Sequence, residues 1–181
     1  MGDLMDFSVY DSRPTDKRTE IEERVYDVLD ELNIHYLRTD HSPAATISEC
    51  LKVEKQLDVS ICKNLFLTNN KKSMYCLLLI DGSKKYEAGK VSRQVGSSRL
   101  SFASDAELME HLGITPGSVS VLGLINDTNL NVTVAIDSDL LKNEYFGCHP
   151  CKNTSTLKIR TDDIIHKFIP YTNHNVIIID I

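Results

Sequence analysis

Two apolar segments that follow each other closely constrain the fold of this 181-residue chain most strongly. Asn64–Thr68 and Met74–Ile80 are rich in apolar and aromatic side chains, and only the polar stretch Asn69–Ser73 separates them. A connection this short joins antiparallel strands, because a parallel pair needs a crossover of about a dozen residues or more. The segments therefore predict a hairpin and argue against a doubly wound parallel sheet.

Two helix starts are marked by capping boxes, in which two side chains satisfy backbone N–H groups reciprocally. Thr19 and Glu22 form one such pair, and the apolar residues that follow recur at helical spacing up to Leu32. Ser104 and Glu107 form the second pair. We therefore expect helices that begin directly after Thr19 and after Ser104.

Strand patterns outnumber helix patterns along the chain. Val119–Ile125 and Val132–Ile136 predict a pair of strands across a turn, and Thr156–Ile159 and Val176–Ile181 predict two more. The whole pattern indicates about seven strands and four or five helices, neither alternating nor segregated. We expect an α+β (mixed α/β) fold in which helices pack on a largely antiparallel mixed β-sheet.

Length and composition predict one soluble domain. Residues 1–18 lack apolar periodicity and are expected to form an N-terminal lead-in, poorly ordered or extended, to a single domain at 19–181. The longest apolar runs, Cys76–Ile80 and Val176–Ile179, are far shorter than the ~20 residues of a membrane helix. No basic region precedes an apolar run at the N-terminus, and five cysteines form no even framework. We expect a reduced, cytoplasmic protein without a membrane partner.

Charge is distributed unevenly, although the net charge of −6 excludes a generally basic coat for DNA. Residues 1–51 carry 5 basic and 12 acidic side chains, and residues 100–181 carry 5 and 10. Residues 52–99 carry 10 basic and 4 acidic side chains. Such a block either forms a solvated lysine-rich face or attracts a polyanion locally, and its composition leaves both interpretations open.

The C-x-x-C motif at Cys148–Cys151 is a candidate thiol-redox or metal site. Its context differs from that of thioredoxin, since a strand pattern rather than a long helix follows it. A zinc site needs two more ligands at suitable spacing, and no second C-x-x-C or H-x-x-x-H occurs. We expect two buried or semi-buried thiols beside a loop, and no metal.

Polar and basic groups stand at the ends of two predicted strands. Lys63 and Asn64 precede an apolar strand, where a lysine either lies along the surface or points into a cleft as a fixed positive charge. His149, Asn153 and Thr154 belong to a polar loop that leads directly into another strand. Taken singly, each segment is also consistent with an ordinary turn or strand end.

Glycines bracket the predicted strand at Gly117–Gly123. A glycine permits close approach of the backbone to a ligand, and exposed N–H groups can hold a developing oxyanion. The segment is therefore a third candidate part of a site, with a turn or strand end as the alternative.

Four blocks stand in the order Lys63–Leu67, Arg99–Ala103, Thr115–Ser120 with Gly123-Leu124, and His149-Pro150 with Asn153-Thr154. Together they resemble the YbaK/aminoacyl-tRNA-synthetase-associated domain family over about residues 20–181. The His-Pro-x-x-Asn-Thr form resembles the prolyl-tRNA-editing branch, which includes the ProX-like and PrdX-like proteins. The early His41–Ala44 element is also similar. Two features depart from the pattern, because Val121 stands where the branch usually has proline and Cys148 and Cys151 flank the His-Pro pair.

The resemblance implies a trans-editing deacylase that hydrolyses the ester of a mischarged aminoacyl-tRNA, above all alanine on proline tRNA. It implies no metal or cofactor, and we expect water as the attacking group, with the free ribose hydroxyl of the tRNA as a candidate aid to the attack. The implied partners are the acceptor end of the tRNA, reached by the basic block, and prolyl-tRNA synthetase as a further candidate. The implied catalytic residues are Lys63, Asn64, Gly123 and His149, and the implied substrate-binding residues are Ser101, Ser120, Val121, Asn153 and Thr154.

Two other functions remain open. The same cleft could hold a charged tRNA or an amino acid without hydrolysing it, as a regulatory module. A thiol-redox protein would instead use Cys148 and Cys151. His149 is also consistent with a packing residue.

Overall fold

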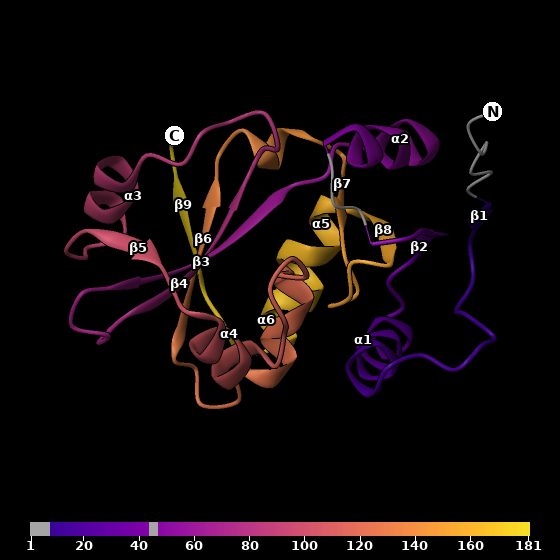
Figure 1. The fold of residues 1–181 in the computed structure, drawn as a ribbon, viewed down its shortest axis with the longest axis horizontal. Helices are drawn as coiled ribbons and strands as arrows, with labels where there is room; N and C mark the ends of the chain where they lie inside the picture. The colour runs from indigo at the N-terminus through magenta and orange to yellow at the C-terminus, as the bar shows by residue number, and fades with distance from the viewer. Residues whose placement is uncertain (1–7, 44–46) are drawn as a thin grey trace.

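The computed structural model describes residues 8–43 and 47–181, and it confirms the α+β fold class (Figure 1). Where the sequence predicted about seven strands in one sheet, the described residues form nine strands in two sheets. Most strand pairs are antiparallel, as expected, and the two parallel pairs both involve the strand β6 (Val132–Asp137).

The four-stranded sheet is antiparallel throughout and has the order β1-β2-β8-β7. Its strands are β1 (Val9–Tyr10), β2 (Tyr36–Asp40), β7 (Tyr145–Cys148) and β8 (Ser155–Arg160). The first of these lies within the predicted lead-in, whose Arg13 also contacts Asp27 at 2.7 Å.

The five-stranded sheet has the order β5-β3-β4-β6-β9. The predicted hairpin is confirmed, because β3 and β4 are antiparallel with Leu65 opposite Leu78. β6 lies parallel to both β4 and β9. The strands are β3 (Lys63–Asn69), β4 (Tyr75–Ile80), β5 (Leu100–Phe102), β6 (Val132–Asp137) and β9 (Val176–Ile179).

Helices surround the two sheets, and the C-terminal helical segment lies between them in Figure 1. Both predicted capping boxes are present, since the Thr19 and Ser104 N–H groups donate to Glu22 at 3.0 Å and to Glu107 at 2.8 Å. None of the helices in the described residues has the length and apolarity of a membrane span. They are α1 (Glu20–Glu31), α2 (Ile47–Leu57), α3 (Ala88–Gln94), α4 (Asp105–Leu112), η1 (Val121–Asn126), η2 (Leu140–Lys142), α5 (Thr161–Asp163), η3 (Ile164–Phe168) and α6 (Ile169–Tyr171).

One large apolar cluster joins the two sheets. Phe66 and Leu77 of the five-stranded sheet belong to it together with Phe146 and Leu157 of the four-stranded sheet, and Phe168 of η3 completes it. Because side chains alternate along a strand, the opposite face of β4 packs in a second cluster beneath α3. The shared cluster fixes the position of one sheet relative to the other.

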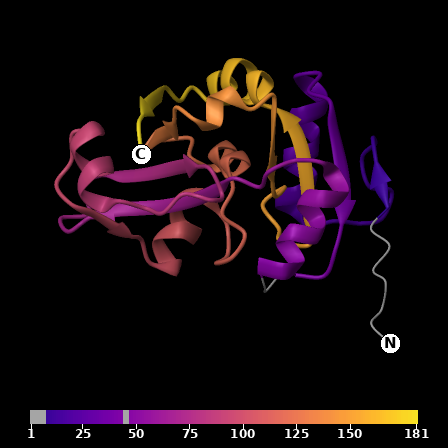
Figure 2. The ribbon, with the colours of Figure 1, turned by 90° about the horizontal axis from the view of Figure 1, so that it is seen from above.

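The backbones of the two sheets meet where β3 begins (Figure 2). The N–H group of Cys62 donates to the carbonyl of Gly147 at 3.1 Å, and that of Gly147 donates to Ser60 at 2.9 Å. A Cβ at Gly147 would lie 3.1 Å from the Ile61 side chain. Glycine at this position therefore permits the close approach of β7 to the start of β3.

The prediction of a strand at Val119–Ile125 is wrong, because Val121–Asn126 forms the 3-10 helix η1. Its first N–H groups bond to side chains instead of a neighbouring strand. Val121 N–H donates to Asn64 at 3.0 Å, and Leu122 N–H donates to Ser120 at 3.2 Å. The predicted partner Val132–Ile136 is indeed a strand, but it pairs with β4 and β9.

Candidate functional site

A cavity of about 290 Å³ lies at the junction of the two sheets. Residues from three separated segments line it: the start of β3, the loop before η1 and the end of β7. The lining residues are Ile61, Cys62, Lys63, Asn64, Leu65, Gly117, Val119, Cys148 and His149. Three of the four predicted catalytic residues, Lys63, Asn64 and His149, are thus brought together.

Asn64 connects the cavity to η1. Its side-chain oxygen accepts the Val121 N–H at 3.0 Å, and its amide nitrogen donates to the carbonyl and to the sulfur of Cys62, both at 3.2 Å. Because oxygen and nitrogen are both engaged within the protein, Asn64 holds the wall of the cavity in place. Val121 itself is fully buried and does not line the cavity.

Lys63 is the first residue of β3 and is exposed. Its ammonium group donates a hydrogen bond to the backbone carbonyl of Lys84 at 2.7 Å. An ammonium group has three N–H donors, so two remain for other partners. The positive charge of Lys63 is therefore held by a neutral carbonyl and not by a carboxylate.

His149 presents one ring nitrogen to the protein. Its Nδ1 lies 2.8 Å from the Ser155 carbonyl, which can only accept, so Nδ1 carries the proton and Nε2 bears a lone pair. Nε2 has no hydrogen-bond partner among the described residues. Burial, and secondarily the nearby His41, lowers the pKa of His149. His149 is thus a neutral hydrogen-bond acceptor beside the cavity.

Three of the predicted substrate-binding residues hold the loops that surround the cavity. The Ser120 hydroxyl donates to the His149 carbonyl at 2.6 Å. The Asn153 N–H donates to the Ser118 hydroxyl at 3.2 Å, and the Thr154 carbonyl accepts the His41 N–H at 2.9 Å. These bonds connect the loop 149–154, called the histidine loop here, to the segment before η1 and to the end of β2.

Gly123 and Ser101 lie outside the cavity. Gly123 is buried in η1, where its N–H donates to the Ser120 carbonyl at 3.1 Å and a Cβ would meet Ile114 Cδ1 at 2.3 Å. Ser101 is exposed on β5 opposite Thr68, at the far end of β3 from Lys63. The structure therefore does not bring these two residues to the group around His149.

Several lining residues were not predicted as part of the site. Ile61, Leu65 and Val119 are apolar, and their sequence context does not distinguish a cavity wall from the core. Gly117 was noted only as a flanking glycine; its φ of +81° favours glycine and follows from the Thr-Pro-Gly turn signal. Cys62 lines the cavity beside Lys63.

The cysteines near the cavity are buried and unpaired. Cys62, Cys148 and Cys151 are each less than 5% exposed and are free thiols. Burial raises the pKa of Cys62 to about 12, and it raises the pKa of Cys148 and Cys151 as well. Because the thiolate is the reactive form, this environment argues against thiol-redox chemistry. No cluster of three metal-ligating side chains occurs within residues 8–43 and 47–181.

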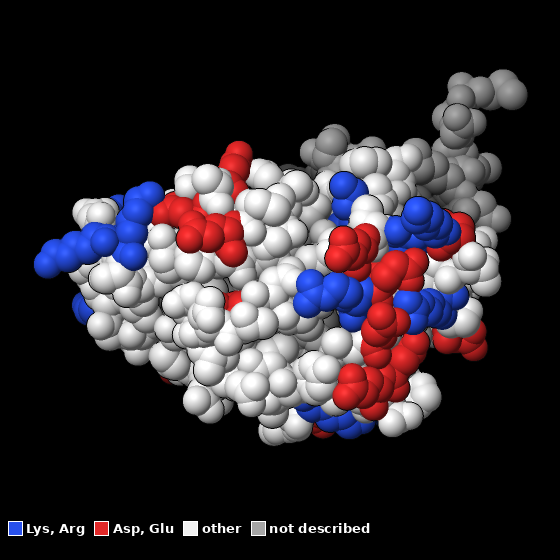
Figure 3. All heavy atoms as spheres, turned by 90° about the horizontal axis from the view of Figure 1, so that it is seen from below, with Lys and Arg blue, Asp and Glu red and all other residues white. Residues whose placement is uncertain are grey.

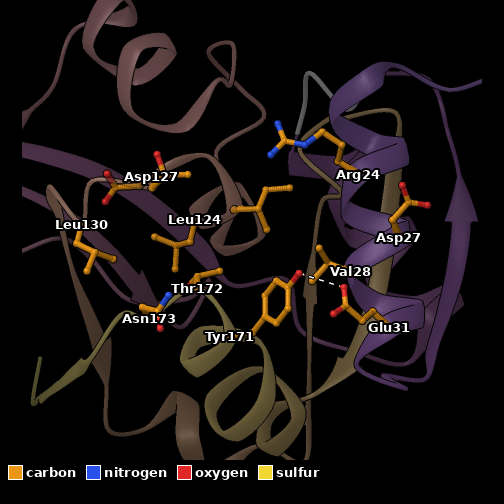
Figure 4. Close-up of a pocket in the computed structure, with 12 residues that line it drawn as sticks. Arg24, Asp27, Val28, Glu31, Leu124, Asp127, Leu130, Tyr171, Thr172 and Asn173 are labelled. Atoms are coloured by element: carbon orange, nitrogen blue, oxygen red, sulfur yellow. Dashed lines mark hydrogen bonds between the residues drawn. The ribbon is translucent and has the colours of Figure 1, made fainter.

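A larger cavity of about 510 Å³ lies between α1 and the end of α6 (Figure 4). Arg24, Asp27 and Glu31 form its α1 wall, and the Tyr171 hydroxyl donates to Glu31 at 3.1 Å. None of the predicted site residues lines it. Figure 3 shows a band of mixed charges, in which acidic side chains predominate, on this α1 side of the molecule.

Known proteins match most of the chain. Residues 41–167 match the family model of the aminoacyl-tRNA editing domain. The chain is 35% identical over 136 residues to the prolyl-tRNA editing protein ProX of Acetoanaerobium sticklandii, covering 75% of this chain and 83% of that protein. It is 30% identical over 168 residues to the prolyl-tRNA synthetase associated domain-containing protein 1 of Danio rerio, covering 92% and 88%.

The fold is also found among solved structures. One of them, described as a candidate trans-editing enzyme for prolyl tRNA synthetase, superposes with a TM-score of 0.68 at 19% identity and covers 91% of this chain and 99% of that one. The resemblance seen in the motif blocks is confirmed by these matches. This chain belongs to the aminoacyl-tRNA editing domain family.

Proposed function

We propose that the protein is a trans-editing deacylase that hydrolyses the ester between a misattached amino acid and tRNA, with alanine on proline tRNA as its main substrate. One observation carries the proposal: in a chain of the editing family, Lys63, Asn64 and His149 converge on one small cavity from two different sheets. The relative named ProX is called a prolyl-tRNA editing protein, which supports proline tRNA as the carrier.

Discrimination between alanine and proline is assigned to the walls of the cavity. A synthetase cannot strongly reject a smaller amino acid by binding alone, because each missing methylene is worth only ~1–3 kcal/mol. A second, narrower site can admit alanine and exclude proline. In our proposal the apolar walls formed by Ile61, Leu65 and Val119 set this size limit.

The chemistry needs little beyond orientation and charge stabilisation, because an aminoacyl ester is already activated. We assign the attack to water, without metal. Lys63 stabilises the negative charge that develops on the carbonyl oxygen or orients the terminal ribose and phosphate. The lone pair of neutral His149 Nε2 accepts a hydrogen bond from the amino group of the substrate. Asn64 and Ser120 hold the walls of the cavity in place through their hydrogen bonds to Val121 and to His149. Asn153 and Thr154 hold the histidine loop.

The tRNA is assigned to the basic block, although two of its members are already engaged. Lys72 pairs with Glu107 at 2.7 Å, and Lys84 pairs with Asp137 at 2.6 Å. The other basic side chains of the block form no ion pair with a described carboxylate and can contact phosphates. These are Lys52, Lys55, Lys63, Lys71, Lys85, Lys90, Arg93 and Arg99. The carboxylates of α1 repel a polyanion, so we expect tRNA to approach from another side. Prolyl-tRNA synthetase is a candidate partner, and the cytoplasm is the expected location.

Deacylation of proline tRNA charged with alanine tests the proposal. Loss of one charge-stabilising group costs roughly 100- to 1,000-fold in rate, so Lys63→Ala should nearly abolish hydrolysis. The matched control is Lys167→Ala, which removes an ion pair with Asp163 on the helical segment and should leave the rate unchanged. A rate for Lys63→Ala within about threefold of the wild type contradicts the role of Lys63.

Two further measurements separate the alternatives. Binding of the mischarged tRNA without any hydrolysis would favour the regulatory module. Activity lost only in Cys148→Ser/Cys151→Ser would favour a thiol mechanism. A panel of tRNAs carrying alanine, serine or proline identifies the amino acid that is removed.

A further inference from the structure

A short turn after β4 lies against the wall of the candidate cavity. Residues 81–84 form this turn, which is closed by its own hydrogen bonds: Asp81 accepts the Ser83 N–H at 2.8 Å, and its carbonyl accepts the Lys84 N–H at 3.0 Å. A Cβ at Gly82 would lie 2.6 Å from the carbonyl oxygen of Ile61, a lining residue. The turn is therefore in direct contact with the cavity wall.

The side chain of Lys84 anchors this turn to the five-stranded sheet. Its ammonium nitrogen lies 2.6 Å from a carboxylate oxygen of Asp137 and 2.6 Å from one of Asp139, and it donates to the Ile181 carbonyl at 3.0 Å. Asp137 is fully buried at the end of β6. Because a buried charge is costly without its partner, the ammonium group of Lys84 is fixed in this position.

The backbone carbonyl of the same residue receives the ammonium group of Lys63 at 2.7 Å. A lysine side chain loses rotamer entropy when it is held in one conformation, so a free lysine populates several rotamers. Lys63 is exposed and has no ion pair among the described residues. The position of the Lys63 ammonium group therefore depends on the position of the Lys84 carbonyl.

We propose that Lys84 is a positioning residue for the deacylation, acting through Lys63. This inference rests on the proposed function. The ion pairs of Lys84 with Asp137 and Asp139 hold the turn, and the turn places the carbonyl. The carbonyl accepts one N–H of Lys63, which leaves two N–H groups for the substrate. Without these ion pairs the ammonium group of Lys63 populates several rotamers, and fewer of them reach the ester. Binding of tRNA through other phosphate contacts is unchanged.

The effect should therefore appear in kcat and not in KM. Misplacement of a catalytic group by about 1 Å can cost up to about 100-fold, so we expect Lys84→Met to lower kcat by roughly 10- to 100-fold. KM should stay within about twofold, since an interaction made in the transition state is lost and ground-state binding is not. Lys84→Arg keeps a cation for the two carboxylates and should restore part of kcat.

A second variant separates a loss of positioning from a loss of stability. Lys84→Met leaves the buried Asp137 side chain without its cationic partner, whereas Lys84→Met/Asp137→Asn replaces the carboxylate with an amide of nearly the same size. We expect the same fall in kcat in this double variant, with a melting temperature closer to the wild type. The control Lys167→Met removes the ion pair with Asp163 and should change neither kcat nor KM.

A readout without tRNA tests the position of Lys63 directly. Brief treatment of the whole protein with acetic anhydride, followed by mass spectrometry, measures how fast each lysine is acylated. The rate at Lys63 should rise severalfold in Lys84→Met/Asp137→Asn, because the hydrogen bond that holds its ammonium form is weakened, while the rate at exposed Lys55 stays the same.

The outcomes separate this inference from the proposed function. The positioning role is overturned, and the deacylase proposal stands, if Lys63→Ala is inactive but Lys84→Met and Lys84→Met/Asp137→Asn keep kcat within about twofold and leave Lys63 acylation unchanged. If activity falls only in proportion to the unfolded fraction, the role of Lys84 is structural and the inference is likewise overturned. If Lys63→Ala keeps its activity, Lys63 has no role in the reaction and the inference falls with it, whereas an absence of deacylation by the wild type contradicts the proposed function itself.

Discussion

The side-chain oxygen of Asn64 accepts a hydrogen bond from the backbone N–H of Val121 at 3.0 Å. This bond joins the start of β3 to the first residue of a 3-10 helix that lies 57 positions further along the chain. Val121 is fully buried, and its N–H group loses this partner if Asn64 is replaced. Asn64 therefore stabilises the arrangement that shapes the candidate cavity.

Asn64→Ala should lower the free energy of unfolding by about 1–3 kcal/mol, the cost of leaving a buried donor unsatisfied. Chemical denaturation followed by circular dichroism measures the change. The matched control is Asn143→Ala, because the side chain of Asn143 has no hydrogen-bond partner among the described residues. The control should stay within about 0.5 kcal/mol of the wild type. Equal losses in the two variants would contradict the role of the Asn64–Val121 bond.

Gly123→Ala should destabilise the protein by about 1–3 kcal/mol, because the added methyl group overpacks the core around Ile114. Ile114→Val removes the Cδ1 atom that lies 2.3 Å from the position of this methyl group, so it should relieve part of the loss in the double variant. Gly89→Ala is the control: nothing lies within 4 Å of its Cβ position on α3, and the change should be neutral or stabilising. Thermal unfolding of the four variants gives the coupling energy, and a coupling of zero contradicts the contact.

His149 should make stability depend on pH. Burial lowers its pKa in the folded protein, so the unfolded chain binds the proton first as the pH falls. Stability is therefore lost as the pH decreases from about 6.5, the ordinary pKa of histidine, towards the lower folded value. His149→Asn removes this component, and the difference in unfolding free energy between about pH 7.5 and about pH 5 should become smaller. The exposed His35→Asn should not reduce that difference, and a reduction equal to that of His149→Asn would count against the explanation.

The buried thiols should be slow to react. In a Cys50→Ser background only Cys62, Cys76, Cys148 and Cys151 report, and all four are buried. Their thiolates are scarce in the folded protein because burial raises the pKa of each. We expect these four thiols to react with a chromogenic disulfide reagent only at the rate of unfolding in the native protein, and rapidly once denaturant is added. Rapid reaction of Cys148 in the native protein would support the redox alternative instead.

Local signals in the sequence were sufficient for most of the secondary structure. The capping boxes at Thr19 and Ser104 and the hairpin across Asn69–Ser73 rest on neighbouring residues, and all three are present in the structure. The motif blocks likewise identified the family, and they named Lys63, Asn64 and His149, which share one cavity. These features depend on residue type and short spacing, which a sequence displays directly.

The segment at Val121–Asn126 shows where local signals fail. Its apolar residues favour a strand, but its backbone donors bond to Asn64 and Ser120, and Gly123 packs against Ile114. Two of these partners lie elsewhere in the chain, so the competing 3-10 conformation is stabilised only after the sheets have come together. Gly123 was expected to contribute to the site because the segment was predicted as a strand. In the structure it lies in the core and does not line the cavity.

The sequence by itself determined the helix starts, the hairpin, the family and the residue types available for chemistry, because each follows from short-range spacing and side-chain chemistry. Only the tertiary structure decided that there are two sheets, that Gly147 lets them approach, and that Lys63 and His149 meet at their junction. These outcomes depend on packing and hydrogen bonds between residues far apart in the chain. Which distant residues become partners is decided by the apolar surface that they bury and by the buried polar groups that gain hydrogen bonds, and neither follows from short-range spacing.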